Sequence, residues 1–125
     1  MRIKIDKADV VFSLFIRLRD KMCVKCKRLG DPDKEGRPVI GLQCSHFFGR
    51  AKESTRFDPL NCDSLCMGCH MYWGSTDREA YREFKIKQLG KKQFDLMVLR
   101  ANRPITISRK DYRFLKHKEF KEMIK

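Results

Sequence analysis

The sequence lacks any long apolar run. Its longest one, residues 10–16, is interrupted by Ser13, whereas a membrane-spanning helix needs about 20 apolar residues. The first residues also lack the apolar stretch and cleavage site of a secretory signal. We therefore expect no membrane partner and a cytoplasmic protein, in a compartment that keeps thiols reduced.

Acidic residues are scarce relative to basic ones. The chain of 125 residues has 16 acidic and 29 basic residues, which gives a net charge of +13. Such an excess predicts a polyanionic partner, because phosphate contacts by Lys and Arg release counterions from nucleic acid. An anionic membrane surface would satisfy the charge as well, but no apolar segment is long enough to span a bilayer. Nucleic acid is therefore the expected partner.

Internal repeats and low-complexity tracts are missing too, and the length favours one domain. Hydrophobic spacing and turn residues predict an α+β fold. Helices are expected over residues 9–20, 76–89, 91–101 and 108–124. A strand or hairpin arm is expected over residues 39–48, and residues 49–65 are polar and irregular. The expected parts are an N-terminal helix in residues 1–22, a core in residues 23–90 and a basic helical extension in residues 91–125.

The first predicted helix has both a buried face and a cap. Val11, Leu14, Phe15 and Leu18 have the spacing of side chains that share one helix face. Asp9 precedes them and is the expected N-cap. We expect this helix to pack against the core and to lead directly into the first cysteine pair.

Four of the six cysteines fall into two CxxC pairs, Cys23/Cys26 and Cys66/Cys69. In a reducing compartment two such pairs predict one tetrahedral zinc site rather than disulfides. A short chain also gains noticeably from a structural metal, because its core alone is small. The other two cysteines, Cys44 and Cys62, are interpreted as small buried apolar residues.

Between and beside these pairs the chain places His46, Asn61 and His70, separated by 15 and 9 residues. Each of these residues alone is a weak signal, but the order His, Asn, His within a basic, cysteine-bracketed segment is specific. The sequence resembles the HNH (ββα-metal) endonucleases, in which a β-hairpin carries the first His, a loop carries the Asn and a helix carries the last ligand. The resemblance implies an α+β domain with a ββα-metal core, flanked by N-terminal and C-terminal helices.

More narrowly, residues 9–90 resemble the phage NinG/Rap recombination nucleases. The resemblance is carried by residues 12–20 before Cys23, by residues 45–47 followed by Arg50, and by residues 56–58 before Asn61. It implies a metal-dependent DNA endonuclease acting on branched or recombining DNA in a bacterial or phage-infected host cell. A homodimer would suit paired cleavage of a junction.

The resemblance and the chemistry together assign roles. A neutral imidazole suits the activation of water, so His46 is the expected general base. His70 is the expected ligand of a catalytic Mg²⁺ or Mn²⁺, which acts as a Lewis acid. Asn61 either binds this metal through its amide oxygen or ties the loop that orients His46. Three basic side chains are expected to contact phosphates: Arg50, Lys52 and Arg56.

One position departs from the family pattern. Many HNH enzymes have a metal-binding Asp immediately before the first His, and Ser45 stands there in this chain. The catalytic metal would then rest on His70 with Asn61 or Asp58, on Cys44, or on additional water. The alternative function is a non-catalytic, zinc-bound DNA- or RNA-binding protein in which the same residues are structural.

Overall fold

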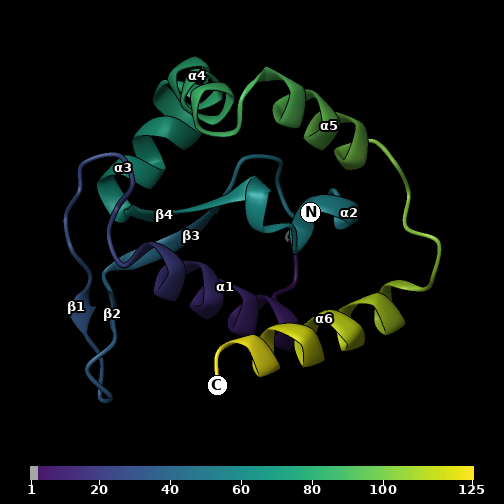
Figure 1. Ribbon diagram of the computed structural model, residues 1–125, viewed down its shortest axis with the longest axis horizontal. Coiled ribbons are helices and arrows are strands. Elements are labelled where there is room, and N and C mark those ends of the chain that lie inside the picture. The colour runs from purple at the N-terminus through teal and green to yellow at the C-terminus, as the bar shows by residue number, and fades with distance from the viewer. Residues whose placement is uncertain (1–2) are drawn as a thin grey trace.

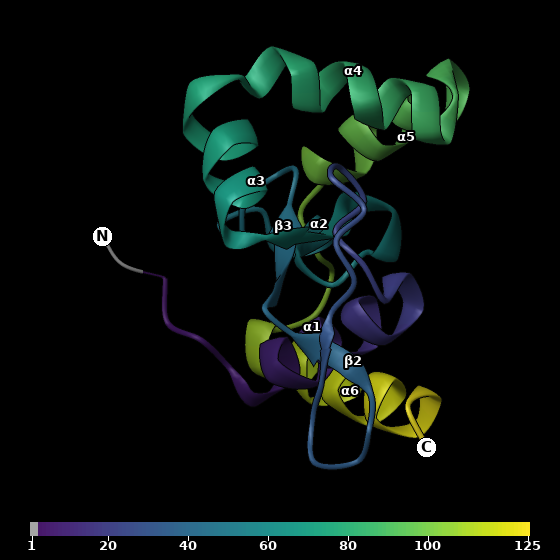
Figure 2. The same ribbon diagram turned by 90° about the vertical axis from the view of Figure 1, so that its left-hand side faces the viewer.

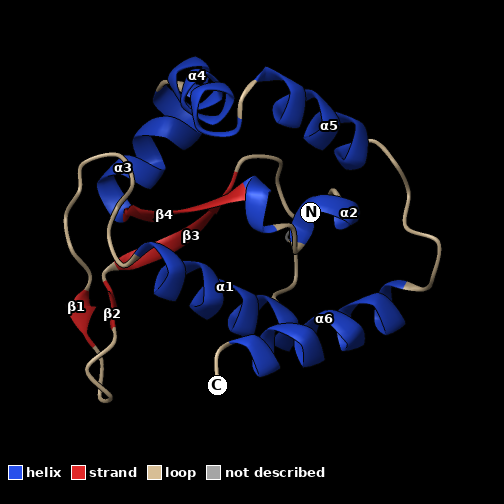
Figure 3. Ribbon diagram, viewed as in Figure 1, coloured by secondary structure: helices blue, strands red, loops and turns tan. Residues whose placement is uncertain are grey.

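The computed structural model describes residues 3–125, and in this part of the chain six α-helices and two small antiparallel sheets form an α+β fold (Figures 1 and 3). The elements in chain order are α1 (Lys7–Asp20), β1 (Asp31–Pro32), β2 (Pro38–Ile40), β3 (Leu42–His46), α2 (Glu53–Arg56), the 3₁₀ turn η1 (Pro59–Asn61), β4 (Cys62–Cys66), α3 (Met67–Met71), the π-helical turn η2 (Tyr72–Thr76), α4 (Arg78–Leu89), α5 (Lys91–Ala101) and α6 (Arg109–Met123). None of the helices in residues 3–125 has the length and apolar character that a membrane crossing requires.

The β3–β4 hairpin lies in the middle of the molecule, between two groups of helices (Figures 1 and 2). Helices α1 and α6 pack against each other on one side, and α4 and α5 lie together on the other. The short β1–β2 ribbon projects from the end of α1 where the chain turns back towards the hairpin. The hairpin therefore separates two apolar clusters.

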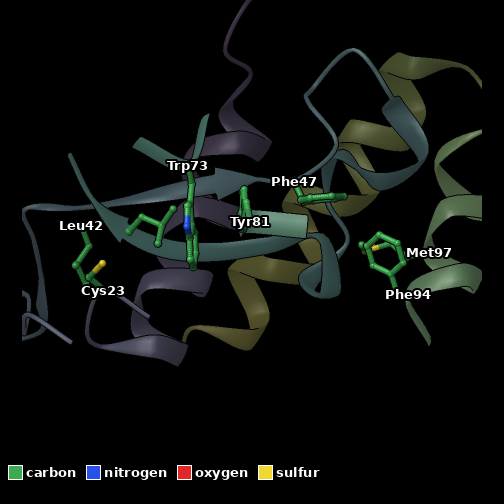
Figure 4. Packing of buried hydrophobic residues seen from close by; sticks show 8 residues of the cluster. Cys23, Leu42, Phe47, Trp73, Tyr81, Phe94 and Met97 are labelled. Atoms are coloured by element: carbon green, nitrogen blue, oxygen red, sulfur yellow. The ribbon is translucent and has the colours of Figure 1, made fainter. Parts of the chain in front are cut away.

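The first cluster is built around aromatic rings from the hairpin and the helices on the α4 side (Figure 4). Trp73 and Tyr81 stack with ring centroids 4.8 Å apart, and Phe47 meets Tyr81 edge-on at 5.2 Å. Phe94 of α5 contacts Phe47, which anchors that helix. The second cluster lies on the α1 side and contains Ala8, Phe12, Ile16, Cys44, Phe57, Cys62 and Phe120.

The first helix differs from its prediction in its start and in its buried face. It begins at Lys7, and Asp6 is the N-cap, whose side chain accepts from the N–H of Ala8. Asp9 is therefore not the cap but the third helical residue, which completes a capping box by accepting from the N–H of Asp6. The predicted stripe of Val11, Leu14, Phe15 and Leu18 was wrong by one residue around the helix. Ala8, Phe12 and Ile16 form the fully buried row, and the predicted residues flank it and are partly buried.

The predicted irregular segment 49–65 contains a strand. Residues Cys62–Cys66 form β4, which pairs with β3 in the register Leu42↔Cys66, Cys44↔Ser64 and His46↔Cys62. Its sequence hides this because Asp63 and Ser64 are polar yet fully buried. Asp63 is satisfied by Lys85 at 3.0 Å and by Gln88 at 2.9 Å, both from α4. The strand therefore depends on partners distant in the chain.

The three later helices agree with their predictions to within two residues. Helix α4 is capped by Asp77, whose side chain accepts from the N–H of Ala80, and it ends at Gly90. Gly90 has a positive φ of 83°, which favours glycine at the junction to α5. Helix α6 is capped by Ser108.

Candidate metal centre and active site

The four predicted zinc ligands come together, with the sulfurs of Cys23, Cys26, Cys66 and Cys69 all within 4.8 Å of one another. The Sγ atoms of Cys26 and Cys66 lie 3.8 Å apart. Tetrahedral Zn–S bonds of about 2.3 Å place sulfurs about 3.8 Å from each other. This cluster can therefore hold a metal ion such as zinc, and it joins the turn after α1 to the junction of β4 and α3.

The backbone around the first pair is folded as a tight knuckle. The N–H of Lys27 donates to the carbonyl of Cys23 at 2.8 Å, and Lys27 takes a positive φ of 67°. The N–H of Cys26 points at the sulfur of Cys23 at 3.5 Å. Burial opposes ionisation of Cys23, but hydrogen bonds from the backbone N–H groups of Cys26, Cys66 and Lys25 outweigh it and lower the pKa of its thiol to about 7. A thiolate is the form that binds zinc, so the lowered pKa of Cys23 favours metal binding.

The thiol of Cys69 ionises less readily than that of Cys23. Burial and the neighbouring sulfurs raise the pKa of the Cys69 thiol to about 12. Several negative charges at this range repel one another, so four thiolates coexist only when a divalent cation neutralises them. The donor set of four sulfurs is the one that structural zinc prefers.

His46 ends β3 and is held by a backbone carbonyl. Its Nε2 donates to the oxygen of Arg56 at 2.9 Å; a carbonyl only accepts, so the proton sits on Nε2 and Nδ1 keeps its lone pair. Burial, reinforced by the positive charge of Arg50, lowers the pKa of His46 to about 4. The imidazole is therefore neutral at pH 7 and has one nitrogen available as a proton acceptor.

A buried neutral histidine makes stability depend on pH. The pKa of His46 is about 4 in the folded chain against about 6.5 when unfolded, so the unfolded chain binds the proton more readily. The contribution of neutral His46 to the free energy of unfolding is fully present above pH 6.5. It is lost as the pH falls towards 4, and the total loss is about 3 kcal/mol. We expect urea unfolding midpoints to fall over this window in the parent chain and to fall less in His46→Gln. Equal slopes for both proteins would contradict this assignment.

Asn61 lies at the end of η1 and is fully buried. Its Nδ2 donates to the carbonyls of Phe48 and Thr55 at 2.9 and 3.1 Å, and its Oδ1 accepts from the N–H of Phe48 at 2.8 Å. The amide thus ties both ends of the loop that follows His46. This arrangement favours the loop-tying role over the role of metal ligand, because a metal would have to displace the Phe48 N–H.

His70 projects from α3 and is half-buried. Its Nδ1 hydrogen-bonds the side-chain oxygen of Gln43 at 2.5 Å, which leaves the lone pair on Nε2. Burial and the charge of Arg50 lower the pKa of His70, so this ring also favours the neutral form. An outer hydrogen bond that orients a ring in this way is typical of metal-binding histidines.

The two histidines share one small pocket of about 260 Å³, lined by Ile3, Cys44, His46, Gly49, Arg50 and His70. One strand (β3), one helix (α3), the loop after His46 and the segment before α1 contribute to its walls. The histidines, 24 positions apart in sequence, are thus brought to one cavity by the hairpin and the helix that follows it. Gln43 carries no motif signal, and only its contact with His70 identifies it.

The three predicted phosphate-binding residues have different surroundings. Arg50 lines the pocket and its Nε lies 3.6 Å from Asp9. The ammonium of Lys52 donates to Asn102 at 3.0 Å and lines a different pocket, near the connection between α5 and α6. Arg56 was predicted wrongly, because its side chain is only 2% exposed and is bound by Asp9 and by the carbonyl of Lys4.

The Asp9–Arg56 pair yields a stability prediction. Arg56→Met leaves the carboxylate of Asp9 buried without its main partner, and such a loss costs about 3–5 kcal/mol. The matched control is Arg82→Met, since Arg82 is exposed and 3.7 Å from Glu79, where a pair is worth less than about 1 kcal/mol. Urea unfolding of both variants measures the difference. If both variants lost the same free energy of unfolding, the buried pair would stabilise the fold no more than the exposed pair does.

Ser45, the position where a metal-binding carboxylate was expected, does not line the pocket. Its hydroxyl accepts from the hydroxyl of Tyr81 at 3.1 Å, within the buried network around Asp63. The pocket wall is formed instead by the neighbouring Cys44. A carboxylate at position 45 would enter the α4 network rather than approach His70.

Comparisons with protein-family models, with curated proteins and with solved structures returned no match for this chain. These comparisons therefore show neither a family nor an activity for this chain.

Proposed function

We propose that this protein is a metal-dependent DNA endonuclease of the HNH class, similar to the NinG/Rap recombination nucleases. The observation that carries the proposal is the pair of oriented histidines in one pocket. His46 is fixed through Nε2 and His70 through Nδ1, so each has its other nitrogen available. Two antiparallel strands followed by a helix supply these side chains, which is the arrangement expected of a ββα-metal core.

In this proposal His46 removes a proton from water at Nδ1, and the resulting hydroxide attacks the phosphorus of a phosphodiester. The Arg56 carbonyl keeps the ring orientation fixed while Nδ1 takes up the proton, and it stabilises the imidazolium that forms. Asn61 holds the loop that contains Gly49 and Arg50 against the end of β3. The activated water is therefore presented at a defined place in the pocket.

A divalent ion, when bound, would neutralise charge on the phosphoryl oxygens and assist the departing 3′ oxygen. His70 is the protein residue that would hold it. None of the side chains that line this pocket among residues 3–125 is a carboxylate. The fit to Mg²⁺ or Mn²⁺ is therefore loose, with one nitrogen ligand and the remaining positions left to water and substrate.

Charge supports DNA as the substrate. The chain carries +13, and the guanidinium of Arg50, whose side chain is 31% exposed, lines the pocket. In this proposal it pairs with a phosphate oxygen of the bound DNA. Branched or recombining DNA as the particular substrate, and a homodimer to cut it, follow from the resemblance.

The test is cleavage of nicked, branched and linear DNA with Mg²⁺ or Mn²⁺, with EDTA and His46→Ala as controls. Cleavage that needs the ion and His46 would support the nuclease. The lack of a pocket carboxylate favours one alternative, a non-catalytic zinc-bound DNA- or RNA-binding protein. Intact DNA in every lane together with salt-sensitive binding would support that alternative and rule out the enzyme.

A further inference from the structure

Two cysteines beside the pocket have no part in the proposed reaction. Cys44 lies two residues before His46 on β3, and Cys62 is the direct partner of His46 on β4. The two sulfurs and a ring nitrogen of His46 all lie within 4.8 Å of one another. This group shares no residue with the four-cysteine cluster.

We propose that Cys44, His46 and Cys62 form a second metal site, which takes a thiophilic ion such as Zn²⁺ or Cd²⁺. Two sulfurs and one imidazole are ligands that select such ions over Mg²⁺. Three protein ligands leave a fourth position of a tetrahedron open. Cys44 and His46 line the pocket, so the open position faces the pocket and the ion has a way in.

The site is weaker than the four-cysteine cluster for a physical reason. Cys62 is fully buried and Cys44 nearly so, with apolar neighbours such as Phe12 in the same cluster. Buried thiols in apolar surroundings resist ionisation, so an ion must displace their protons at a cost. The second ion is therefore expected to bind only after the cluster is filled.

Occupation of this site has a consequence for the pocket, which rests on the proposed function. Nε2 of His46 is committed to the Arg56 carbonyl, so Nδ1 is the nitrogen that can bind an ion. The same lone pair accepts the proton from water in the proposed reaction. A bound thiophilic ion therefore inhibits cleavage by removing the general base.

Metal stoichiometry tests the site independently of activity. The full chain, with the four-cysteine cluster already filled by one Cd²⁺ and the thiols kept reduced with a phosphine, is dialysed to equilibrium against further Cd²⁺. Bound metal per chain is quantified, with thiolate-to-metal absorption as a second readout. The parent chain should take up one further ion per chain. Cys44→Ala and Cys62→Ala should take up none.

Ser45→Ala is the matched control, because Ser45 is the strand neighbour of Cys44 and His46 but contacts Tyr81. It should bind the second ion as the parent does. A parent chain that takes up no second ion would overturn the proposal, and so would second-ion binding by both cysteine variants. Cys44→Ala keeps the test valid if Cys62→Ala, in the fully buried position, fails to fold.

Inhibition is measured as a loss of DNA cleavage. For each protein, the cleavage rate with the second ion bound is divided by the rate of the same protein before that ion is added. We expect at least about tenfold inhibition at saturation in the parent and little in Cys44→Ala. Equal inhibition of the two proteins would overturn the inhibitory role. If no protein cleaves DNA, the proposed function fails, while the stoichiometry still decides the metal site.

Discussion

Removing the ion from the four-cysteine cluster is expected to abolish cooperative folding of this chain at 25 °C. Structural zinc in small domains has apparent binding free energies of about 10–16 kcal/mol, whereas whole domains are stable by about 5–15 kcal/mol. The cluster is also the link that fastens the turn after α1 to the β4–α3 junction. Cys26 is exposed, so burial of apolar surface cannot replace the ion there.

The measurement is thermal unfolding by near-ultraviolet circular dichroism, with the released zinc quantified after a strong chelator is added. Cys69→Ala should reproduce the effect of the chelator, because three thiols hold the ion less well than four. Ser45→Ala, a change on β3 away from the cluster, should keep a cooperative transition. An unchanged transition after complete zinc release would show that the cluster is dispensable for the fold.

Replacement of the proposed general base, His46→Ala, is expected to lower the rate of DNA cleavage by about 10²–10⁴-fold while the chain stays folded. Between pH 8 and pH 5.5 the ring of His46 stays neutral, because its pKa is about 4. Protonation of His46 should therefore not lower the cleavage rate of the parent chain over this range. Protonation by itself removes the base only as the pH approaches 4.

His117→Ala is the matched control, since His117 belongs to α6 and lines a separate surface pocket with several lysines. Its rate should equal that of the parent. Rates are measured under single-turnover conditions on one DNA substrate, with circular dichroism to confirm that both variants are folded. A rate for His46→Ala within a few-fold of the parent would remove His46 from the mechanism.

Much of the helical structure could be predicted from the chain alone, because local signals specify it. Asp77 and Gly90 bracket α4, and Ser108 begins α6, as capping and termination rules require. The strand β4 could not be predicted in this way. Its buried Asp63 is stabilised by Lys85 and Gln88, which lie more than 20 positions further along the chain.

The candidate sites also differ in how far the sequence alone could predict them. The spacing of the cysteine pairs was sufficient to predict the four-sulfur cluster, because two CxxC pairs are a typical ligand pattern of one tetrahedral zinc site. The predicted phosphate contact of Arg56 was wrong because charge alone does not reveal burial. Its partner Asp9 lies 47 positions away, and only the tertiary fold brings the two together.

By itself, therefore, the sequence determined the basic charge, the grouping of the four cysteines and the four longer helices, and it singled out His46 and His70 as candidates. The tertiary structure decided which nitrogen of each histidine is available, because Gln43 and the Arg56 carbonyl occupy the others. It also directed Ser45 away from the pocket and placed Cys44 and Cys62 beside His46. These decisions depend on strand register and helix packing, which join residues too far apart in the chain for local spacing to specify.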